Sequence, residues 1–557
     1  MKSQWYRLAY TARQIDERAA RYIRRGMGWS YHARCSGHEG IQIALGLAFR
    51  ANKDFLFPYY RDTATVLAAG MTSLELMLNG LSKQADTGSA GRHMSNHFSK
   101  PSIGIQNVSS CTGNHTLHAV GVARGIRYYE SDGVALCSQG ESSVSEGYCF
   151  EAYNGASREK LPVLFVIQNN GYGISVPVTE QTANLCVADN FTGLKNLKII
   201  RCDGTDFEDS HKAIEEALAY IKTGNGPAMV HAQCVRMGAH SNSDAQELYR
   251  SKEEIAKAQL QDPLPKLRAL LKAKEAEKIE QEVEAELDKA ALEAEAAPVP
   301  TAQSVFDFAQ GTSPTYAEAT GGKPLTEEKL REAINRTLHE EFTYNPDTFM
   351  WGQDVASKDK GGVFNLTKGL LATYGHKRVF NGPIAEDFIV GTANGLCRFK
   401  PEIRVVIEAA QFADYVWPAM EQIVEMSHEH WRSNGQFSPN VVLRLASGGY
   451  ITGGLYHSQN IEAIMSHLPG VRVVYPAFAD DAAGLLRMAM RSEGMTFFLE
   501  PKYLYNRAEA KGPNLGSEHM VEFGKSRIRR AGKDLTLITY GNTVHICLLY
   551  TSDAADE

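Results

Sequence analysis

A stretch of small and turn-forming residues divides this chain of 557 residues into two parts. Residues 298–324 mix Pro, Gly, Ser and Thr with little periodicity, a composition typical of a flexible tether. On both sides of it, short apolar runs alternate with longer helical patterns, as in the strand–helix–strand units of a parallel sheet. The runs that predict strands are 134–137, 163–167, 348–352, 378–381, 404–408 and 441–445. We therefore expect one α/β half over 1–297 and a second over 325–510.

The end of the first half has a different texture. Residues 253–295 are rich in Lys, Glu and Ala, with Leu267, Leu270 and Leu271 at helical spacing. This pattern predicts long helices with a large solvent-facing surface, forming a helical extension of the first half.

The charge balance excludes some classes of partner. The formal net charge is −7, so the chain offers no basic field for a phosphate backbone, which argues against nucleic acid. Residues 1–23 carry scattered charges and no long apolar run, so we expect no signal peptide, no membrane span and a cytoplasmic location. The nine cysteines form no CxxC pair, which argues against a disulfide framework or a structural zinc site.

Two polar residues follow neighbouring strand-like runs. Glu141 comes directly after the first run of the sheet pattern, and Asn170 comes directly after the next. Ligands of open α/β sheets bind outside the carboxyl ends of the strands, so the two side chains can converge on one cation although 29 positions separate them. Magnesium prefers oxygen ligands and keeps substrate phosphates in its shell. The spacing therefore predicts a magnesium and phosphate site.

The residues around this pair resemble the thiamine-diphosphate signature. The first block runs Gly140, Glu141, Ser142, Ser143 and on to Gly147, and the second runs Gln168-Asn169-Asn170-Gly171-Tyr172. Glu in place of the usual Asp is similar to the branched-chain branch of the 2-oxo acid dehydrogenases, in their thiamine-diphosphate-dependent decarboxylating component. The resemblance implies Glu141, Asn170 and the carbonyl of Tyr172 as metal ligands, with Gly140, Ser142 and Ser143 lining the cofactor.

Further segments of the first half support the resemblance. The segments 37–40 and 57–62 resemble the family's cofactor-entry segments, in which Tyr60 and Arg61 would hold diphosphate oxygens. The segment 236–244 resembles the loop that covers the active site. This implies cofactor contacts for Arg236 and a catalytic, cofactor-contacting role for His240.

The second half resembles the beta subunit of the same component, so the chain resembles fused alpha and beta subunits. The segment 379–391 implies that Glu386 is the carboxylic acid that activates the thiamine pyrimidine ring. Phe412 and Tyr415 lie in a segment that lines the pyrimidine. His457 lies in a segment that supplies an active-site histidine, which could donate a proton.

Four positions depart from the family pattern. Ser142 stands where the family usually has Gly, and Thr112 replaces an aliphatic residue that often supports the bent cofactor. Gln353 stands where relatives often carry Glu, and Gln168 replaces an Arg seen in branched-chain enzymes. We expect these departures to affect the pocket, an acid relay and one phosphate charge.

The end of the chain has two expected parts. Residues 535–540 read as a strand that opens a third domain over 511–546, a truncated start of the transketolase-like carboxyl-terminal domain. Residues 547–557 resemble a translated sequencing adapter. The fold class implied for the whole is α/β, with a diphosphate-binding and a pyrimidine-binding domain, each a parallel sheet flanked by helices.

The resemblance implies a function. An oxidoreductase of this kind would use thiamine diphosphate and Mg²⁺ to decarboxylate a 2-oxo acid such as 2-oxoisovalerate. It would then acylate the lipoyl group of a dihydrolipoyl acyltransferase core, acting as a homodimer of fused chains. Pyruvate is the alternative substrate, and a non-catalytic scaffold subunit is the alternative of a different class. Whether one active site draws on one chain or on two stays open.

Overall fold

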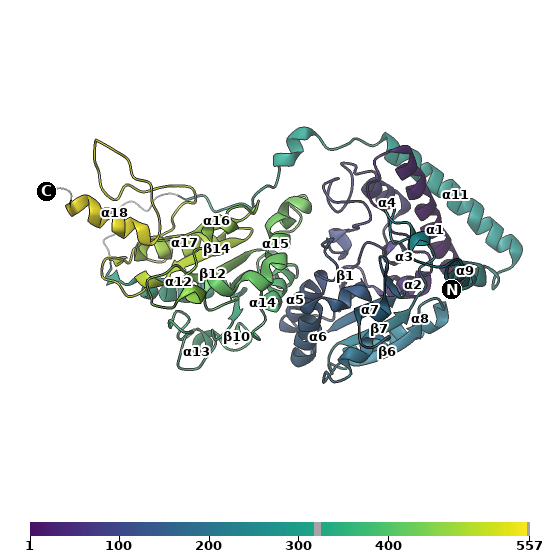
Figure 1. Ribbon diagram of the computed structural model, residues 1–557, viewed down its shortest axis with the longest axis horizontal. Helices are drawn as coiled ribbons and strands as arrows, with labels where there is room; N and C mark the ends of the chain where they lie inside the picture. Colours follow the sequence, from purple (N-terminus) through teal and green to yellow (C-terminus); the bar gives the residue numbers. More distant parts are fainter. Residues whose placement is uncertain (317–324, 554–557) are drawn as a thin grey trace. The chain divides into compact units, whose positions relative to one another are not determined.

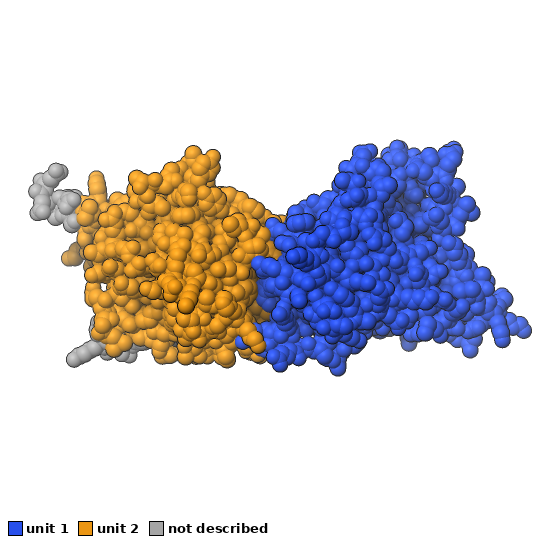
Figure 2. Space-filling model, turned by 90° about the horizontal axis from the view of Figure 1, so that it is seen from below, with its two compact units in different colours: residues 1–307, 432–436 blue, residues 308–431, 437–557 orange. Residues whose placement is uncertain are grey.

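The computed structural model describes residues 1–316 and 325–553. The chain forms two compact units, shown in different colours in Figure 2. Unit 1 comprises Met1–Asp307 and Arg432–Gln436, and unit 2 comprises Phe308–Trp431 and Phe437–Glu557. Each unit is built around its own sheet of parallel strands, as the alternation of apolar runs and helical patterns predicts.

Unit 1 contains a parallel sheet with the strand order β1-β2-β3-β7-β6. Successive side chains of a strand point to opposite faces, and both faces are covered by helices (Figure 1). Leu164 and Val166 of β3 join the core cluster that holds α2 and α8, whereas Phe165 between them packs against Tyr153 of α6. The strands are β1 (Phe55–Phe57), β2 (Ala135–Gly140), β3 (Val163–Asn169), β6 (Lys198–Asp203) and β7 (Ala228–Gln233). The covering helices are α2 (Glu39–Ala48), α5 (His115–Tyr128), α6 (Gly147–Glu159) and α8 (Phe207–Lys222).

The expected helical extension of the first half is present, and it buries one face. The helix α11 (Ala273–Ala296) packs against α1 (Lys2–Arg25) and α4 (Ser73–Gly80). Its buried positions recur every three or four residues, and they include Ile279, Val283 and Leu287. The remaining elements of unit 1 are α3 (Thr63–Ala68), β4 (Tyr172–Gly173), β5 (Val176–Pro177), α7 (Val178–Gln181), α9 (Lys252–Leu260) and α10 (Pro263–Arg268).

Unit 2 contains a parallel sheet with the strand order β10-β9-β11-β12-β14-β13. Met350 of β9 belongs to the core that includes α12 and α17, whereas the neighbouring Trp351 donates a hydrogen bond to the Ile389 carbonyl of α14, so helices again cover both faces. The strands are β9 (Thr348–Gly352), β10 (Val379–Asn381), β11 (Arg404–Glu408), β12 (Val441–Ser447), β13 (Arg472–Val474) and β14 (Thr496–Pro501). The helices are α12 (Leu330–Tyr344), α13 (Leu370–Tyr374), α14 (Glu386–Cys397), α15 (Met420–Arg432), α16 (Glu462–Met465) and α17 (Ala479–Arg491).

Part of the expected tether is held in place. Residues 317–324 of it lie outside the described residues. Before them, the Thr312 hydroxyl donates a hydrogen bond to Glu493 at 2.7 Å, and the Gly311 carbonyl accepts one from Arg472. After them, β8 (Glu327–Glu328) pairs with β15 (Gly512–Pro513). The described part of the tether thus includes residues that hydrogen-bond to unit 2.

The expected strand at 535–540 is wrong. These residues form no strand in the described part of the chain, and Leu535 and Ile538 are 69% and 91% exposed. A strand needs a ladder of hydrogen bonds to a neighbour, and no described segment pairs with this one. The helix α18 (Asn542–Asp553) follows, and residues 554–557 of the expected tail lie outside the described residues. No helix in residues 1–316 or 325–553 has the length and apolarity to cross a bilayer.

Candidate active site

Glu141 and Asn170 meet at the carboxyl edge of the sheet of unit 1. Strands β2 and β3 are hydrogen-bonded neighbours, with Gly140 opposite Gln168. Glu141, which follows β2, and Asn170, which follows β3, therefore lie side by side. The Asn170 amide donates to Glu141 Oε2 at 3.2 Å, and the Tyr172 amide donates to Asn170 Oδ1 at 3.2 Å. Glu141 is 3% exposed, and burial raises the pKa of its carboxyl group. Within residues 1–316 and 325–553, this buried carboxylate accepts hydrogen bonds from the Ser142 hydroxyl and the Asn170 amide and from no basic side chain, which suits it to a cation.

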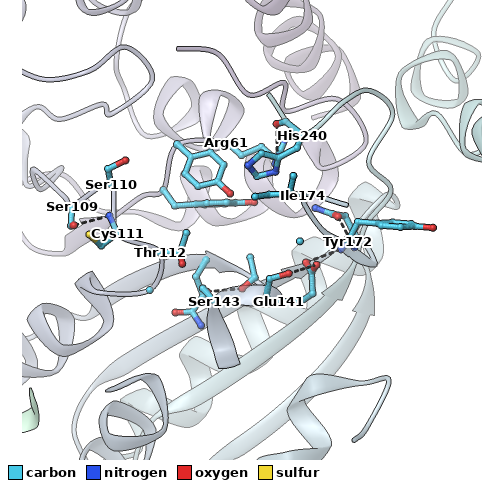
Figure 3. Close-up of a pocket in the computed structure, with 18 of the residues that line it drawn as sticks. Arg61, Ser109, Ser110, Cys111, Thr112, Glu141, Ser143, Tyr172, Ile174 and His240 are labelled. Atoms are coloured by element: carbon cyan, nitrogen blue, oxygen red, sulfur yellow. Dashed lines mark hydrogen bonds between the residues drawn. The ribbon is translucent and has the colours of Figure 1, made fainter. Parts of the chain in front are cut away.

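A cavity of about 350 Å³ opens above this edge. Figure 3 shows Arg61 and His240 across the cavity from Glu141 and Ser143, with Tyr172 at one end and Cys111 and Thr112 toward the other. The lining therefore combines one anionic side chain, one guanidinium and many neutral hydroxyl groups. Its size is that of a site for a small molecule.

Three consecutive residues after β1 form the wall opposite Glu141. The Arg61 guanidinium is held by the carbonyls of Arg34 at 2.7 Å and His240 at 3.2 Å, and it lies over the Tyr60 ring at 5.6 Å. The Tyr59 hydroxyl is buried and has no hydrogen-bond partner among the described residues. Burial also raises the pKa of Tyr59 well above its ordinary value, so this hydroxyl keeps its proton. A buried donor beside a fixed guanidinium suits an anionic ligand.

Tyr59 is missing from the residues that the sequence singles out. Sequence reasoning selects Tyr60 and Arg61 from the same segment, and both line the cavity. The only sequence signal for Tyr59 is that it stands next to Tyr60 and Arg61, just after the end of β1 and therefore at the carboxyl edge of the sheet.

The expected covering loop contributes His240 directly and Arg236 indirectly. His240 lines the cavity with its ring 5.9 Å from that of Tyr60. Burial, and then the charges of Arg61 and Arg236, lowers the pKa of His240 to about 4, so its imidazole is neutral at pH 7. Arg236 instead donates to the Ile174 carbonyl at 2.8 Å and stacks 5.4 Å from the Tyr172 ring. Its guanidinium braces the turn that presents Tyr172.

The serine at position 142 is accommodated without crowding the cavity. Its hydroxyl donates to Glu141 Oε1 at 3.1 Å and accepts from Gln181 at 3.2 Å. A Cβ atom on Gly173 would lie 2.4 Å from this hydroxyl oxygen, so a glycine there makes room for Ser142. Ser143 donates to the Gly140 carbonyl at 2.7 Å, and Gly140, Ser142 and Ser143 all line the cavity.

No group of three or more His, Cys, Asp or Glu side chains suited to a metal occurs in residues 1–316 or 325–553. The ligand set implied by the resemblance contains one carboxylate, one amide oxygen and one main-chain carbonyl. It is a set that magnesium accepts when phosphate oxygens and water complete its shell.

In unit 2, Glu386 lies at the start of α14, just after β10. Its carboxylate accepts a hydrogen bond from Gln353 Nε2 at 2.7 Å, and the Gln353 carbonyl accepts one from Gln411 at 2.5 Å. Gln353 follows β9 and Gln411 follows β11, so all three residues lie at the carboxyl edge of the second sheet. The glutamine that departs from the family pattern therefore contacts the carboxylate singled out as catalytic.

The structure brings Phe412, Tyr415 and His457 together. The His457 ring is 4.4 Å from Phe412 and 5.7 Å from Tyr415, measured between ring centroids. His457 Nδ1 lies 3.0 Å from the Gly453 carbonyl, which can only accept, so Nδ1 carries a proton and donates. Nε2 faces the Tyr415 hydroxyl at 3.4 Å.

Two residues that support this cluster are absent from the sequence expectations. The Asp414 carboxylate accepts from the amides of Ser458 and Gln459 at 3.0 and 3.1 Å, which fixes the loop after His457. Lys502, after β14, is buried with its ammonium 5.6 Å from the Phe412 ring centroid, and burial lowers the pKa of Lys502 to about 8. Their sequence signal is weak, because both follow strand ends but neither forms a charged pair that spacing reveals.

Comparison with known families matches each unit separately. The model of the dehydrogenase E1 component matches residues 6–303, and that of the transketolase pyrimidine-binding domain matches residues 327–507. These matches agree with the parallel sheets of the two units, so the expected fold class is confirmed.

Curated relatives divide in the same way. The chain is 35% identical to the 2-oxoisovalerate dehydrogenase subunit alpha of Bacillus subtilis (strain 168) over 309 residues, 54% of this chain and 93% of that subunit. It is 38% identical to the subunit beta of the same organism over 218 residues, 39% of this chain and 64% of that subunit. It is 29% identical to the 3-methyl-2-oxobutanoate dehydrogenase subunit alpha of Mycobacterium tuberculosis (strain CDC 1551 / Oshkosh) over 334 residues, 60% of this chain and 87% of that subunit.

The chain spans less than two thirds of the length of the Bacillus beta subunit. The family-model matches and the similarity to both alpha and beta subunits nevertheless confirm the expected fusion. The chain belongs to the dehydrogenase E1 component family, and it joins in one polypeptide a region similar to the alpha subunit and a region similar to the beta subunit of 2-oxoisovalerate dehydrogenases.

Proposed function

We propose that this protein decarboxylates a branched-chain 2-oxo acid such as 2-oxoisovalerate with thiamine diphosphate and Mg²⁺, and transfers the acyl group to a lipoyl group. The observation that carries the proposal is the hydrogen-bonded pair of Glu141 and Asn170 in a cavity that has Arg61 on its opposite side and Tyr59 in its lining. This arrangement offers a cation site and an anion site on opposite walls of one cavity, as a metal-bound diphosphate requires.

The residues of unit 1 fit that ligand. Glu141, Asn170 and the Tyr172 carbonyl would hold the magnesium ion. Arg61 would neutralise diphosphate oxygens, and the unpartnered Tyr59 hydroxyl would gain the acceptor that it lacks. His240, neutral at pH 7, adds no charge and can donate one hydrogen bond from its ring.

The residues of unit 2 fit the proton transfers. Thiamine diphosphate, when bound, supplies a nucleophilic carbon and an electron sink for decarboxylation. Glu386 would bond to a ring nitrogen through a carboxyl group that Gln353 holds by one oxygen. The Gly453 carbonyl accepts a hydrogen bond from His457 Nδ1, and Nε2 faces the Tyr415 hydroxyl. Nε2 would therefore be the ring nitrogen that exchanges a proton with a substrate or lipoyl atom.

The names of the relatives support the substrate and the partner. The Bacillus subunits are named for 2-oxoisovalerate and the mycobacterial subunit for 3-methyl-2-oxobutanoate, which are two names of the same branched 2-oxo acid. The acceptor would be the lipoyl disulfide of a dihydrolipoyl acyltransferase, which takes up the acyl group and two electrons as carbon dioxide leaves. A homodimer of fused chains is the proposed assembly.

The test measures binding and turnover in the full chain. Calorimetric titration with thiamine diphosphate should show binding only when Mg²⁺ is present. Carbon dioxide release from 2-oxoisovalerate should then exceed release from pyruvate in kcat/KM. Magnesium-independent or absent binding would favour a scaffold subunit, and faster release from pyruvate would overturn the branched-chain assignment.

Mixing two inactive variants addresses the assembly. Glu141→Ala and Glu386→Gln proteins, each inactive alone, are co-expressed with different tags and purified through both. Restored activity in the mixed dimer is expected when one active site draws residues from two chains. Its absence in a verified mixed dimer would assign both residues of each site to one chain.

A further inference from the structure

Beneath the proposed metal site lies a fully buried set of polar side chains that are not among the residues lining the cavity. Gln168, the last residue but one of β3, is 0% exposed and makes hydrogen bonds with four side chains. These partners come from three segments, namely the start of α2, the turn before α3 and strand β2, and they are His38, Gln42, Asp62 and Ser138.

The direction of every hydrogen bond in this set is fixed. The Gln42 amide nitrogen donates to the Arg61 carbonyl at 3.0 Å, and its oxygen accepts from the Ala64 amide at 3.3 Å, so main-chain groups fix its orientation. The same Gln42 nitrogen donates to Gln168 Oε1 at 3.0 Å. Gln168 Oε1 is therefore the acceptor side of its amide.

The contacts of Gln168 Nε2 lead to the same orientation of the amide. Its Nε2 donates to Asp62 Oδ1 at 2.7 Å and to Ser138 Oγ at 2.8 Å. Asp62 also accepts from the Tyr59 amide and the Thr65 hydroxyl, so its carboxylate acts as an acceptor in each of these contacts. Reversing the Gln168 amide would place its oxygen against a carboxylate and its nitrogen against the Gln42 nitrogen.

The orientation of the Gln168 amide determines which ring nitrogen of His38 carries the proton. Its Nδ1 lies 2.9 Å from Gln168 Oε1, which can only accept, so Nδ1 carries the proton. Its Nε2 lies 3.4 Å from Asn170 Nδ2, an amide nitrogen that can only donate, so Nε2 is unprotonated and accepts. The His38 tautomer follows from the geometry at both ring nitrogens.

We propose that Gln168 is a positioning residue that fixes the His38 tautomer and thereby turns Asn170 Oδ1 toward the metal, an inference that rests on the proposed magnesium site. With Nδ2 of Asn170 donating to His38, the amide oxygen is the atom of this side chain left to bind a cation in the cavity that Asn170 lines. The Tyr172 amide, at 3.2 Å, occupies one lone pair of this oxygen and leaves the other for a cation. Partners that orient a metal ligand typically change metal affinity 10- to 100-fold when removed, on the order of magnitude seen in metalloenzymes.

The first arm of the test reads the tautomer without metal. The full chain is labelled with ¹⁵N-histidine, and long-range ¹H–¹⁵N spectra of the apo protein report the protonated nitrogen of each ring. The 17 histidines are resolved for this purpose by comparison with His38→Leu, whose spectrum lacks the signal sought. We expect His38 protonated at Nδ1 in the wild type, and a loss of this single state in Gln168→Met, which is similar in size but whose thioether is only a weak acceptor for Nδ1.

The second arm reads metal affinity. Mn²⁺ binding in the presence of thiamine diphosphate is followed by the electron paramagnetic resonance signal of the free ion. We expect Gln168→Met to bind Mn²⁺ about 10- to 100-fold more weakly than the wild type. Ser138→Ala is the matched control, because it removes a buried hydrogen bond from the same glutamine while leaving its bond to His38, and its affinity should equal that of the wild type.

A second variant covers the case in which Gln168→Met fails to fold. His38→Leu should weaken Mn²⁺ binding by a similar factor, and a folded double variant should be no weaker than either single variant, since the two residues act in one chain of contacts. Unchanged affinity, or weaker binding with the His38 protonation state unchanged in Gln168→Met, would overturn the inference. A wild type that binds no Mn²⁺ with thiamine diphosphate would instead overturn the proposed function.

Discussion

The two units treat their polar side chains differently at the same place in the fold, the carboxyl edge of a parallel sheet. In unit 1, Glu141 and Arg61 are 3% and 2% exposed, and each is fixed by hydrogen bonds to main-chain groups. In unit 2, Glu386 is only half-buried, Tyr415 is 40% exposed, and the loop before His457 carries Tyr456 at 64% exposed. The charged groups at the edge of unit 1 are buried, whereas Glu386 and the two tyrosines of unit 2 are partly exposed.

The different burial of the charged groups in the two units fits the different tasks that we propose for them. A metal and a diphosphate are bound best where water is excluded and oppositely charged groups are fixed in advance, since the electrostatic attraction is stronger there. A group that transfers a proton must instead reach a ligand and release it. We interpret unit 1 as the binding half and unit 2 as the half that supplies proton transfer.

The largest effect is expected from a substitution that removes the buried carboxylate of unit 1. Glu141→Ala deletes the one anionic ligand of the proposed metal site, so Mg²⁺-dependent affinity for thiamine diphosphate should fall by more than about 100-fold, beyond the effect of an outer partner. Calorimetric titration measures it, and activity should be lost with it. Glu180→Ala, an exposed carboxylate of the same unit, is the control. Retained affinity would contradict the assignment of unit 1 as the binding half.

The next effect separates catalysis from binding. Glu386→Gln keeps the size of the side chain and its contact with Gln353 while removing the acid, so kcat should fall by about 10²- to 10⁴-fold. Affinity for thiamine diphosphate should stay close to that of the wild type. Steady-state kinetics with 2-oxoisovalerate and the same titration measure the two. A loss of affinity as large as that of Glu141→Ala would break the contrast between the units.

The sequence predicts regular structure better than it predicts side-chain partners. The strands expected at 348–352 and 404–408 coincide with β9 and β11, because buried parallel strands are continuous apolar runs bounded by turns. The expected strand at 535–540 fails because a strand depends on neighbours that a local pattern does not contain.

For the site, the sequence identifies residues that follow strands, because topology places strand ends together. Glu141 and Asn170 meet for this reason. The sequence misses Tyr59 and Asp414, whose importance rests on an unpaired hydroxyl and on two main-chain amides. For Arg236, the motif gives a position but not the direction of the side chain, and the structure shows its guanidinium against the rings of Tyr172 and Tyr249.

A smaller effect tests how unit 2 holds its partly exposed edge. Asp414→Ala removes the acceptor for two main-chain amides that follow His457, at a cost of about 1–2 kcal/mol for groups left without their partner. Acylation of a lipoyl group should slow by about tenfold, since 1.4 kcal/mol is a factor of ten. Affinity for thiamine diphosphate, measured alongside, should not change. Equal weakening of both would show that Asp414 supports the fold and not the position of His457.

The smallest effect is a pH dependence in unit 1. Burial lowers the pKa of His240 from 6.5 to about 4, so between these values the unfolded chain takes up a proton that the folded chain does not. The contribution of neutral His240 to the free energy of unfolding is therefore present above about pH 6.5 and is lost as the pH falls toward 4. Because the ring is partly exposed, we expect about 1 kcal/mol between pH 7 and pH 5.

Hydrogen exchange measures this loss in the unit where it arises. The opening free energy of peptides from β3 should fall between pH 7 and pH 5 by about 1 kcal/mol more in the wild type than in His240→Asn, which does not titrate. His376→Asn, an exposed histidine of unit 2, is the matched control and should leave the β3 peptides as in the wild type. The same pH dependence in His240→Asn as in the wild type would mean that His240 is solvated, and the wall opposite Glu141 would then be as exposed as the edge of unit 2.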